Sequence, residues 1–472
     1  MFGRAFRKHG LVLGVASLAM LAAALAGCAG TPLYYGRHAV GSQIESRTAH
    51  ALVPARNPGA FSIPPGVDGD DGLREDEAVA VALWNNAAYQ ELLAELGLTR
   101  ADVIEAAQLT NPTFSTMLPV GVKQLEFALT VPLEAVWLRP CRLAAAQRRS
   151  QATANRLVQD GLDLIRDVRL AYADLLLAED LRQIAGENAK LRGRIAALAD
   201  ARVQAGSASQ LDASASRIDE MVERQRAAQL QHEVELARQR LRTWMGVGLS
   251  EVGLEPVPPT IPDLPDDVDA LVDEALVGRP DLWAAVVAFE AARHRATLAR
   301  RDYFHLAAML PDANGDGEKG FEAGPGLVFT LPIFHQNQGA IARADAEVER
   351  AERHFVTVRD QVALEVRQAY TRCVQAREAL HTWDQRIVPA VEDAVAKAAR
   401  AYQAGGTSLL LMLETSRRLL DAQVERAQAA AELRRAAAEL ERSVGAQVFE
   451  HPDATFAFLE KDAALGAVEE LP

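Results

Sequence analysis

The chain has 472 residues and a formal net charge of −14; 49% of its residues are apolar, 6% aromatic and 24% charged. It is too apolar for a disordered chain and too highly charged for a protein built of many membrane-spanning helices. The negative charge argues against a nucleic-acid-binding protein, and three cysteines are too few for a disulfide scaffold.

The N-terminus carries the features of an export signal. Residues 1–27 combine three basic residues with an apolar run over 11–26, which is shorter than the roughly 20 residues of a membrane-spanning helix. We therefore predict a signal peptide. Its end, Leu25-Ala26-Gly27-Cys28, resembles a bacterial lipobox, which implies that Cys28 becomes the lipidated first residue of the mature chain. The alternative is an ordinary signal peptide with an incidental cysteine.

The rest of the chain repeats itself. The segment 168–172 (VRLAY) recurs 198 residues later as VRQAY. Three further matches follow in the same order at spacings of 200, 199 and 199: 129–133 with 329–333, 204–209 with 403–408, and Leu241 and Gly246 with Leu440 and Gly445. Similarity at one fixed spacing indicates a tandem duplication. We predict an extended, lipid-anchored arm (28–73), a first repeat (74–246), a Pro-rich linker (247–265), a second repeat (266–445) and a tail (446–472).

Each repeat has the same predicted order of elements: a helix (74–109 and 268–301), two strands, a very long helix (141–204 and 338–403), and a further helix (209–245 and 408–444). The long helices carry apolar residues at alternating steps of four and three, which is typical of a coiled-coil seam. In the second repeat these are Val362, Val366, Ala369, Cys373, Ala376, Leu380 and Trp383, and in the first Leu164, Val168, Ala171, Leu175 and Ala178.

The predicted strands are 113–118, 124–131, 303–310 and 321–331. Apolar residues alternate with small or polar ones, as in Phe127 and Leu129 against Ala128 and Thr130. Such alternation suits strands of a transmembrane barrel, and the alternative is a pair of hairpins packed on a soluble core. Four strands cannot close a barrel, because small closed barrels need about eight. If the strands span a membrane, several chains must share one barrel, and three chains would supply twelve strands.

This order of elements resembles the TolC-like family of outer-membrane efflux and secretion channels, in particular its lipid-anchored members. The resemblance rests on the duplicated plan, the Thr-x-Pro strand ends, the Gly-x-x-Ser motifs after the long helices, and the turn 278–282 (GRPDL). It implies a mainly α fold with a small membrane β part, in which a homotrimer shares a 12-stranded β-barrel that continues into a helical coiled-coil tunnel. It also implies an outer-membrane location with a periplasmic extension, and contact with a periplasmic adaptor protein and an inner-membrane pump.

The resemblance assigns roles to the two hairpin tips. Gly206 and Ser207 in the first repeat, and Gly405 and Thr407 in the second, match the positions that adaptors contact in the family. A glycine there also permits a tight reversal, and a turn with no further role is the alternative.

The resemblance also suggests an entrance gate. The family carries an acidic ring near the second tip, and Glu414 matches one of its two positions, whereas Leu411 replaces the other acid. Asp212, beyond the first tip, is a further candidate. The alternative for both carboxylates is a solvent-facing position on a helix.

No motif for nucleophilic catalysis, phosphate binding or metal binding is present in the sequence, and the ten histidines lack metal-site spacing. We therefore expect no enzyme activity, no cofactor and no metal. The predicted function is a passive outer-membrane exit duct of a tripartite efflux system. The alternative is a lipid-anchored periplasmic scaffold that forms no pore. Cargo choice is expected to lie in the pump, because metal ions, drugs and secreted proteins all use this architecture.

Overall fold

The computed structural model describes residues 35–52, 61–65, 67, 72–118, 126–206, 208–247, 255–258, 264–265, 267–311 and 326–449. The predicted signal peptide, Cys28, Ser207 and nearly all of the predicted tail lie outside the described residues. The chain divides into two compact units. Unit 1 comprises Met1–Gly36, Glu95–Ala154 and Ala284–Phe355, and unit 2 comprises Arg37–Ala94, Asn155–Trp283 and Val356–Pro472.

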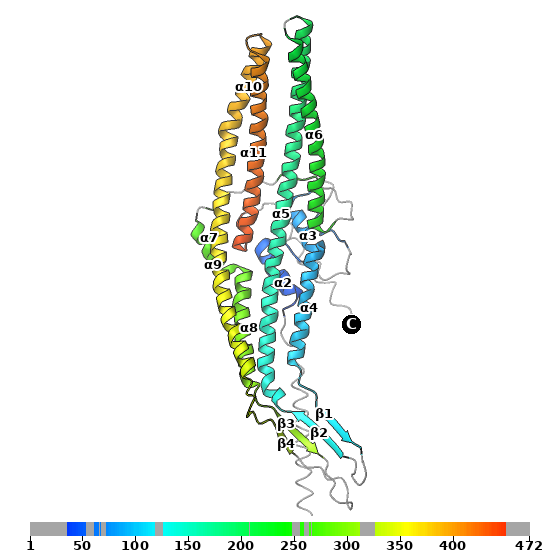
Figure 1. The fold of residues 1–472 in the computed structure, drawn as a ribbon, viewed down its shortest axis with the longest axis vertical. Helices are drawn as coiled ribbons and strands as arrows, with labels where there is room; N and C mark the ends of the chain where they lie inside the picture. Colours follow the sequence, from blue (N-terminus) through cyan, green and yellow to red (C-terminus); the bar gives the residue numbers. More distant parts are fainter. Residues whose placement is uncertain are drawn as a thin grey trace, which may run out of the picture. The chain divides into compact units, whose positions relative to one another are not determined.

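The protein is mainly helical with a small β-sheet, as predicted (Figure 1). The helices are α2 (Arg37–Thr48), α3 (Glu75–Asn85), α4 (Ala87–Ala107), α5 (Glu134–Gln204), α6 (Gln210–Met245), α7 (Val268–Gly278), α8 (Pro280–Arg301), α9 (Gln338–Thr382), the π-helix η1 (Trp383–Ile387), α10 (Val388–Gln403) and α11 (Leu409–Val444). The strands are β1 (Thr113–Met117), β2 (Glu126–Pro132), β3 (Leu306–Pro311) and β4 (Gly326–Phe329). None of the helices in the described part of the chain is long and apolar enough to cross a membrane.

Unit 1 contains the sheet. Its four strands are antiparallel in the order β1-β2-β3-β4, so the pairing of β2 with β3 joins the hairpins of the two repeats. Surface ion pairs mark the same order for the helices: Arg149–Asp102 joins α5 to α4, Arg148–Glu290 joins α5 to α8, and Arg295–Glu347 joins α8 to α9. Such exposed pairs stabilise little, but they show which helices are neighbours.

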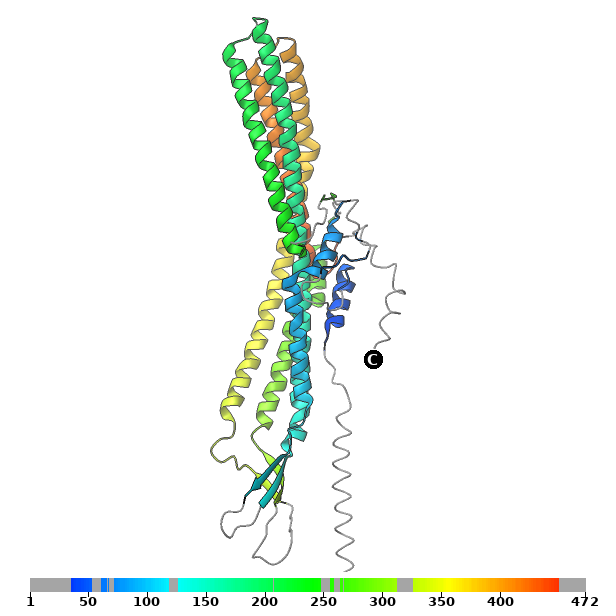
Figure 2. The ribbon, with the colours of Figure 1, turned by 90° about the vertical axis from the view of Figure 1, so that its right-hand side faces the viewer.

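Unit 2 contains two antiparallel helix pairs, α5 with α6 and α10 with α11 (Figure 2). The predicted seam of the second repeat is confirmed, because Val362, Val366 and Cys373 are fully buried. In the first repeat Val168 and Leu175 are likewise fully buried. Alanine at four further seam positions (171, 178, 369 and 376) allows close approach of the helices, so few aromatic residues are needed in the core.

The first helix of each repeat is not continuous, and the predictions for 74–109 and 268–301 are wrong in this respect. The chain breaks at Asn86 and at Arg279, which both have extended backbone angles. At the second break Pro280 explains the interruption, since proline disfavours helical geometry in the preceding residue and has no N–H to donate. At the first break the cause is tertiary, because the Asn86 side chain donates to the carbonyl oxygen of Trp244 at 2.8 Å.

The N-terminal arm is not extended throughout, because α2 forms within it. Its sequence is polar and gives little periodic signal, but Val40 and Ile44 lie one turn apart and are fully buried. Gly161 of α5 provides the space, since a Cβ there would lie 2.7 Å from Cδ1 of Ile44. Packing against α5 therefore stabilises this helix.

Two predicted long helices also differ from the structure. The first begins at Glu134 rather than 141, with Pro140 in its second turn. The second is not continuous over 338–403, because η1 separates α9 from α10.

A buried tyrosine connects the linker to the first repeat. The Tyr172 hydroxyl lies 2.7 Å from the carbonyl oxygens of both Leu73 and Val257, and it accepts a hydrogen bond from the Val257 N–H at 2.9 Å. Leu73 also forms a parallel bridge with Pro256. Tyr172 of the VRLAY motif thus binds the residue directly before the first repeat and the linker that follows it.

Candidate functional site

The sheet has one continuous apolar face. The register places Phe114 opposite Leu129 and Leu129 opposite Leu310, so the apolar positions of both hairpins lie on the same side. Because side chains alternate between faces, this side carries Phe114, Phe127, Leu129, Val131, Leu306, Ala308, Leu310, Leu327 and Phe329, with Thr116 the one polar residue. The rings of Phe114 and Phe127 stack at 5.8 Å. The predicted alternation is confirmed for the described strands.

The opposite face is smaller and more polar, with Thr113, Ser115, Ala128 and Thr130 among its residues. On the apolar face, by contrast, Phe114 and Leu327 are each 64% exposed. A soluble hairpin packed on a core would cover such a face, so this sheet presents its apolar side outward in the single chain.

The sheet also has two open edges. Among the described strands, β1 pairs with β2 alone and β4 pairs with β3 alone. Each edge therefore offers a row of backbone donors and acceptors to a further strand.

The two hairpin tips in unit 2 are built alike. Gly206 and Gly405 follow the long helices with φ of 71° and 76°, the left-handed region that favours glycine. Three residues later a serine caps the next helix: the Ser209 hydroxyl accepts from the Leu211 N–H at 3.1 Å, and that of Ser408 from the Leu411 N–H at 3.3 Å. Both turns are thereby fixed by local sequence.

Beyond the second tip, Glu414 and Leu411 are both 49% exposed on α11. Arg418, one turn further on, donates to Glu414 at 3.3 Å. Asp212 is exposed in the first turn of α6, and Thr407 is half-buried within its turn. All four residues thus lie at or beyond the two tips, as the repeat predicts, and the two carboxylates lie on different hairpins.

The tips are held together by a small core. Ile195 of α5 packs with Ala398 and Tyr402 of α10 and with Met412 of α11. The Arg202 guanidinium lies over the Tyr402 ring, 4.5 Å from its centroid, which adds a cation–π contact.

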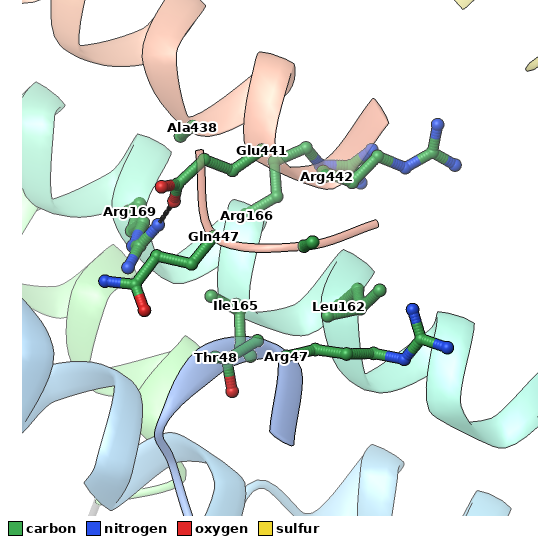
Figure 3. Close-up of a pocket in the computed structure, with 11 residues that line it drawn as sticks. Arg47, Thr48, Leu162, Ile165, Arg166, Arg169, Ala438, Glu441, Arg442 and Gln447 are labelled. Carbon is green, nitrogen blue, oxygen red and sulfur yellow. Dashed lines mark hydrogen bonds and ion pairs between the residues drawn. The ribbon is translucent and has the colours of Figure 1, made fainter. Parts of the chain in front are cut away.

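A buried charge network lies away from the tips in unit 2, beside the pocket drawn in Figure 3. Arg169 of α5 forms an ion pair with Glu441 of α11 and lies 3.4 Å from Asp76 of α3. Burial by itself lowers the pKa of Arg169, but the charges of Glu441, Glu75 and Asp76 outweigh it and raise the pKa above its ordinary value. The network therefore keeps its charges and links the two repeats.

Helix α2 and the described segment after α11 meet at the same pocket. Arg47 of α2 donates to the Gly445 carbonyl at 3.1 Å, and its own carbonyl accepts from the Gln447 N–H at 2.9 Å. Glu441 accepts from the N–H groups of Val448 and Phe449. The segment after α11 is thus tied to α2 as well as to its own helix.

A second network surrounds Arg279, which is 1% exposed. Its guanidinium bonds Asp281 at 2.5 Å and Glu365 at 2.7 Å, and Glu365 also pairs with Arg442 at 2.6 Å. Burial raises the pKa of Glu365, but hydrogen bonds from Gln361 and Arg279 and the charges of both arginines hold it below its usual value.

The helix breaks at Asn86 and at Arg279 have equivalent roles in the two repeats. The Asn86 side chain donates to the Trp244 carbonyl, and in the same way the Arg279 guanidinium donates to the Ser443 carbonyl at 3.1 Å. Each acceptor lies two residues before a glycine of positive φ, Gly246 or Gly445. The sequence indicates the turn 278–282 but not the burial of Arg279 within it; a charged residue directly before Pro280 was the available signal.

An exposed apolar sheet face with two open edges is typical of a membrane-associated protein. Within the described residues no three His, Cys, Asp or Glu side chains are placed to hold a metal ion. The chain belongs to the Outer membrane efflux protein family, whose sequence model matches residues 80–247 and 271–446.

Relatives of known function support this assignment. The chain is 22% identical over 357 residues to the cobalt-zinc-cadmium resistance protein CzcC of Cupriavidus metallidurans, a match covering 75% of this chain and 85% of CzcC. It is 25% identical over 287 residues to the pyoverdine export outer membrane protein OpmQ of Pseudomonas putida, covering 57% of this chain and 58% of OpmQ. Its fold matches that of the outer-membrane channel OprN with a TM-score of 0.63 and 22% identity, over 84% of this chain and 99% of OprN.

Proposed function

We propose that this protein is the outer-membrane duct of a tripartite efflux system, a passive channel from the periplasm to the exterior. The observation that carries the proposal is the sheet, whose register gathers the apolar residues of both hairpins on one face and leaves both edges open. In a membrane such a face contacts lipid, while unpaired edges must be satisfied by another strand.

The open edges favour a homotrimer. Four strands from each of three chains give the twelve strands of a shared barrel, in which β4 of one copy pairs with β1 of the next. The family membership supports this assembly.

The hairpin tips are the proposed contact for a periplasmic adaptor, which would connect the duct to an inner-membrane pump. Gly206, Ser207, Gly405 and Thr407 are the proposed contact residues, and the serine caps that follow Gly206 and Gly405 support a defined docking surface. Cargo selection is assigned to the pump, in keeping with relatives as different as CzcC and OpmQ.

Glu414 is proposed to face the entrance, where three copies would form a cation-favouring ring beside the apolar Leu411. Asp212 is proposed as a weaker contributor. The exposure of Glu414 supports this role, and its pairing with Arg418 reduces the field of the ring. We expect Glu414→Gln to lower the cation preference of the pore, measured as the reversal potential in a salt gradient. Arg418→Gln should raise it, and unchanged reversal potentials in both variants would refute the assignment.

Cys28 is proposed to anchor the mature chain by lipid in the outer membrane. Mass spectrometry of the N-terminal peptide should detect acyl chains on Cys28, and unmodified Cys28 would contradict the anchor.

The function itself is tested by purification in detergent and reconstitution. We expect a heat-resistant trimer that conducts ions in planar bilayers. A water-soluble monomer after removal of Cys28 would refute the duct and favour a periplasmic scaffold that forms no pore.

A further inference from the structure

Three arginines of unit 1 lie near the sheet without a carboxylate partner. Arg139 and Arg142 belong to the first three turns of α5, and Arg301 is the last residue of α8. In the described part of the chain no Asp or Glu side chain forms an ion pair with any of the three, whereas Arg149 and Arg295, on the same two helices, each have one. The described residues therefore leave these three positive charges uncompensated.

The groups that these arginines contact are neutral. Nε of Arg139 donates to the carbonyl oxygen of Ala107, the last residue of α4, at 2.5 Å. Nη1 of Arg301 lies 3.0 Å from Sγ of Cys141. Nε and Nη2 of Arg142 are buried and have no hydrogen-bond partner among the described residues. Because a guanidinium carries five N–H donors, this cluster has donors to spare for an anion rich in oxygen.

The cluster lies at the end of the sheet that adjoins the helices (Figure 1). The Leu133 N–H, between β2 and α5, donates to the Leu306 carbonyl at the start of β3, at 2.8 Å. At about 1.5 Å per residue, Arg139 and Arg142 lie about 8 and 12 Å beyond the first residue of α5. Helical side chains tilt toward the N-terminus of their helix, which for α5 is the end at the sheet. Both guanidinium groups can therefore reach back toward the strand ends.

Exposed aromatic side chains lie at the same end of the sheet. Phe334, after β4, is 95% exposed, Tyr303, before β3, is 48% exposed, and Trp137, in the first turn of α5, is 38% exposed. The segment with Phe334 is tied to α8, because the Asn337 side chain donates to the Ala299 carbonyl at 2.9 Å. Aromatic residues of membrane proteins gather at the level of the lipid headgroups, and phosphate groups lie at the same level.

We propose that Arg139, Arg142 and Arg301 bind the phosphate group of an anionic phospholipid at the periplasmic surface of the outer membrane. Trp137 and Phe334 contact the acyl chains of the same lipid. Guanidinium groups suit phosphate because their planar donors form paired, charge-assisted hydrogen bonds. A phosphatidylglycerol headgroup supplies the negative charge that the described residues lack here, whereas a zwitterionic headgroup brings its own cation. The site rests on the proposed insertion of the sheet in the membrane.

Lipid binding to the full-length protein in detergent, followed by native mass spectrometry, tests the site. The probes are dioleoylphosphatidylglycerol and dioleoylphosphatidylcholine. We expect wild-type protein to bind phosphatidylglycerol about tenfold more tightly, and Arg142→Gln with Arg301→Gln to remove this preference. Phe334→Ala should weaken the binding of both lipids alike. The matched control is Arg149→Gln with Arg295→Gln, which removes the same charge from the same helices farther from the sheet and should keep the preference.

A second variant guards against misfolding, because Arg142 is half-buried. Arg301 is exposed, so Arg301→Gln alone should leave the fold intact and reduce the preference about threefold. Equal binding of the two lipids by wild-type protein, or an equal loss in the control, would overturn the site. Displacement of phosphatidylglycerol by an equal concentration of inorganic phosphate would assign the site to free phosphate and also overturn the proposal.

Planar-bilayer recordings separate the lipid site from the duct. If wild-type protein conducts ions but binds both lipids equally, the duct stands and the lipid site is wrong. If wild-type protein does not conduct but prefers phosphatidylglycerol through Arg142 and Arg301, the duct is wrong and the site stands.

Discussion

Replacing Arg279 by methionine tests whether the second break in the chain is held by charge. Methionine keeps much of the length of arginine but removes the bonds to Asp281, Glu365 and the Ser443 carbonyl. The substitution leaves two carboxylates without their shared cation in a site where the arginine is 1% exposed.

The cost follows from burial of the groups left behind. Removing one partner of a buried ion pair typically costs about 3–5 kcal/mol. Asp281 and Glu365 remain 27% and 21% exposed and so keep some water, and Glu365 keeps Arg442. We therefore expect the low end, about 3 kcal/mol, or roughly a 150-fold change in the unfolding equilibrium constant.

Urea unfolding followed by circular dichroism measures this change. The matched control is Arg367→Met, which breaks the ion pair with Asp269. The two side chains of this pair are 61% and 74% exposed. That pair should be worth less than about 1 kcal/mol. The double variant Arg279→Met with Asp281→Asn should recover part of the loss, because it removes the carboxylate charge that has lost its cation. Equal costs for Arg279→Met and Arg367→Met would refute the reasoning.

Three further outcomes follow from the same unit. The folded state holds the pKa of Glu365 below its usual value, so the Glu365 carboxylate stabilises the fold above about pH 4.5, and this stabilisation is lost as pH falls through the folded pKa. In urea titrations, the difference in free energy of unfolding between the wild-type protein and Glu365→Gln should therefore narrow below about pH 4.5. Gly246→Ala should cost at least about 1–2 kcal/mol in thermal unfolding, because φ is 70° and a Cβ would lie 2.2 Å from the Asn85 carbonyl oxygen. The control Gly186→Ala, in open space within α5, should instead stabilise the protein by about 1 kcal/mol. Tyr172→Phe should cost about 1 kcal/mol, because it removes the hydroxyl bonded to Leu73 and Val257, while the Val257 N–H keeps its bond to the Leu73 carbonyl. An unchanged unfolding midpoint would contradict the role given to this hydroxyl.

The periodic features were predictable because they depend only on residues a few positions apart in the sequence. Val362 and Val366 belong to a seam that any long helix with this spacing must bury, and the alternation at Phe127 and Leu129 fixes which side of a strand is apolar. The duplication was visible for the same reason, and with it the equivalence of the tips at Gly206 and Gly405.

The π-helical turn Trp383–Ile387 combines a local and a tertiary feature. The change of spacing from 198 to 199 residues is contained in the sequence, but nothing local distinguishes an added residue in a loop from one in a helix. The hydrogen bond from Val388 to Trp383 decides that question.

The sequence by itself determined the duplicated helical plan, the one-sided strands and the positions of the tips, because each depends on neighbours a few residues apart. Only the tertiary structure decided the rest. Helix α2 exists because Ile44 finds space at Gly161, and Arg169 can be buried because Glu441, 272 residues away, lies beside it. Such contacts leave no periodic trace in the chain, since a buried charge or a polar helix is stable only where distant residues supply its partners.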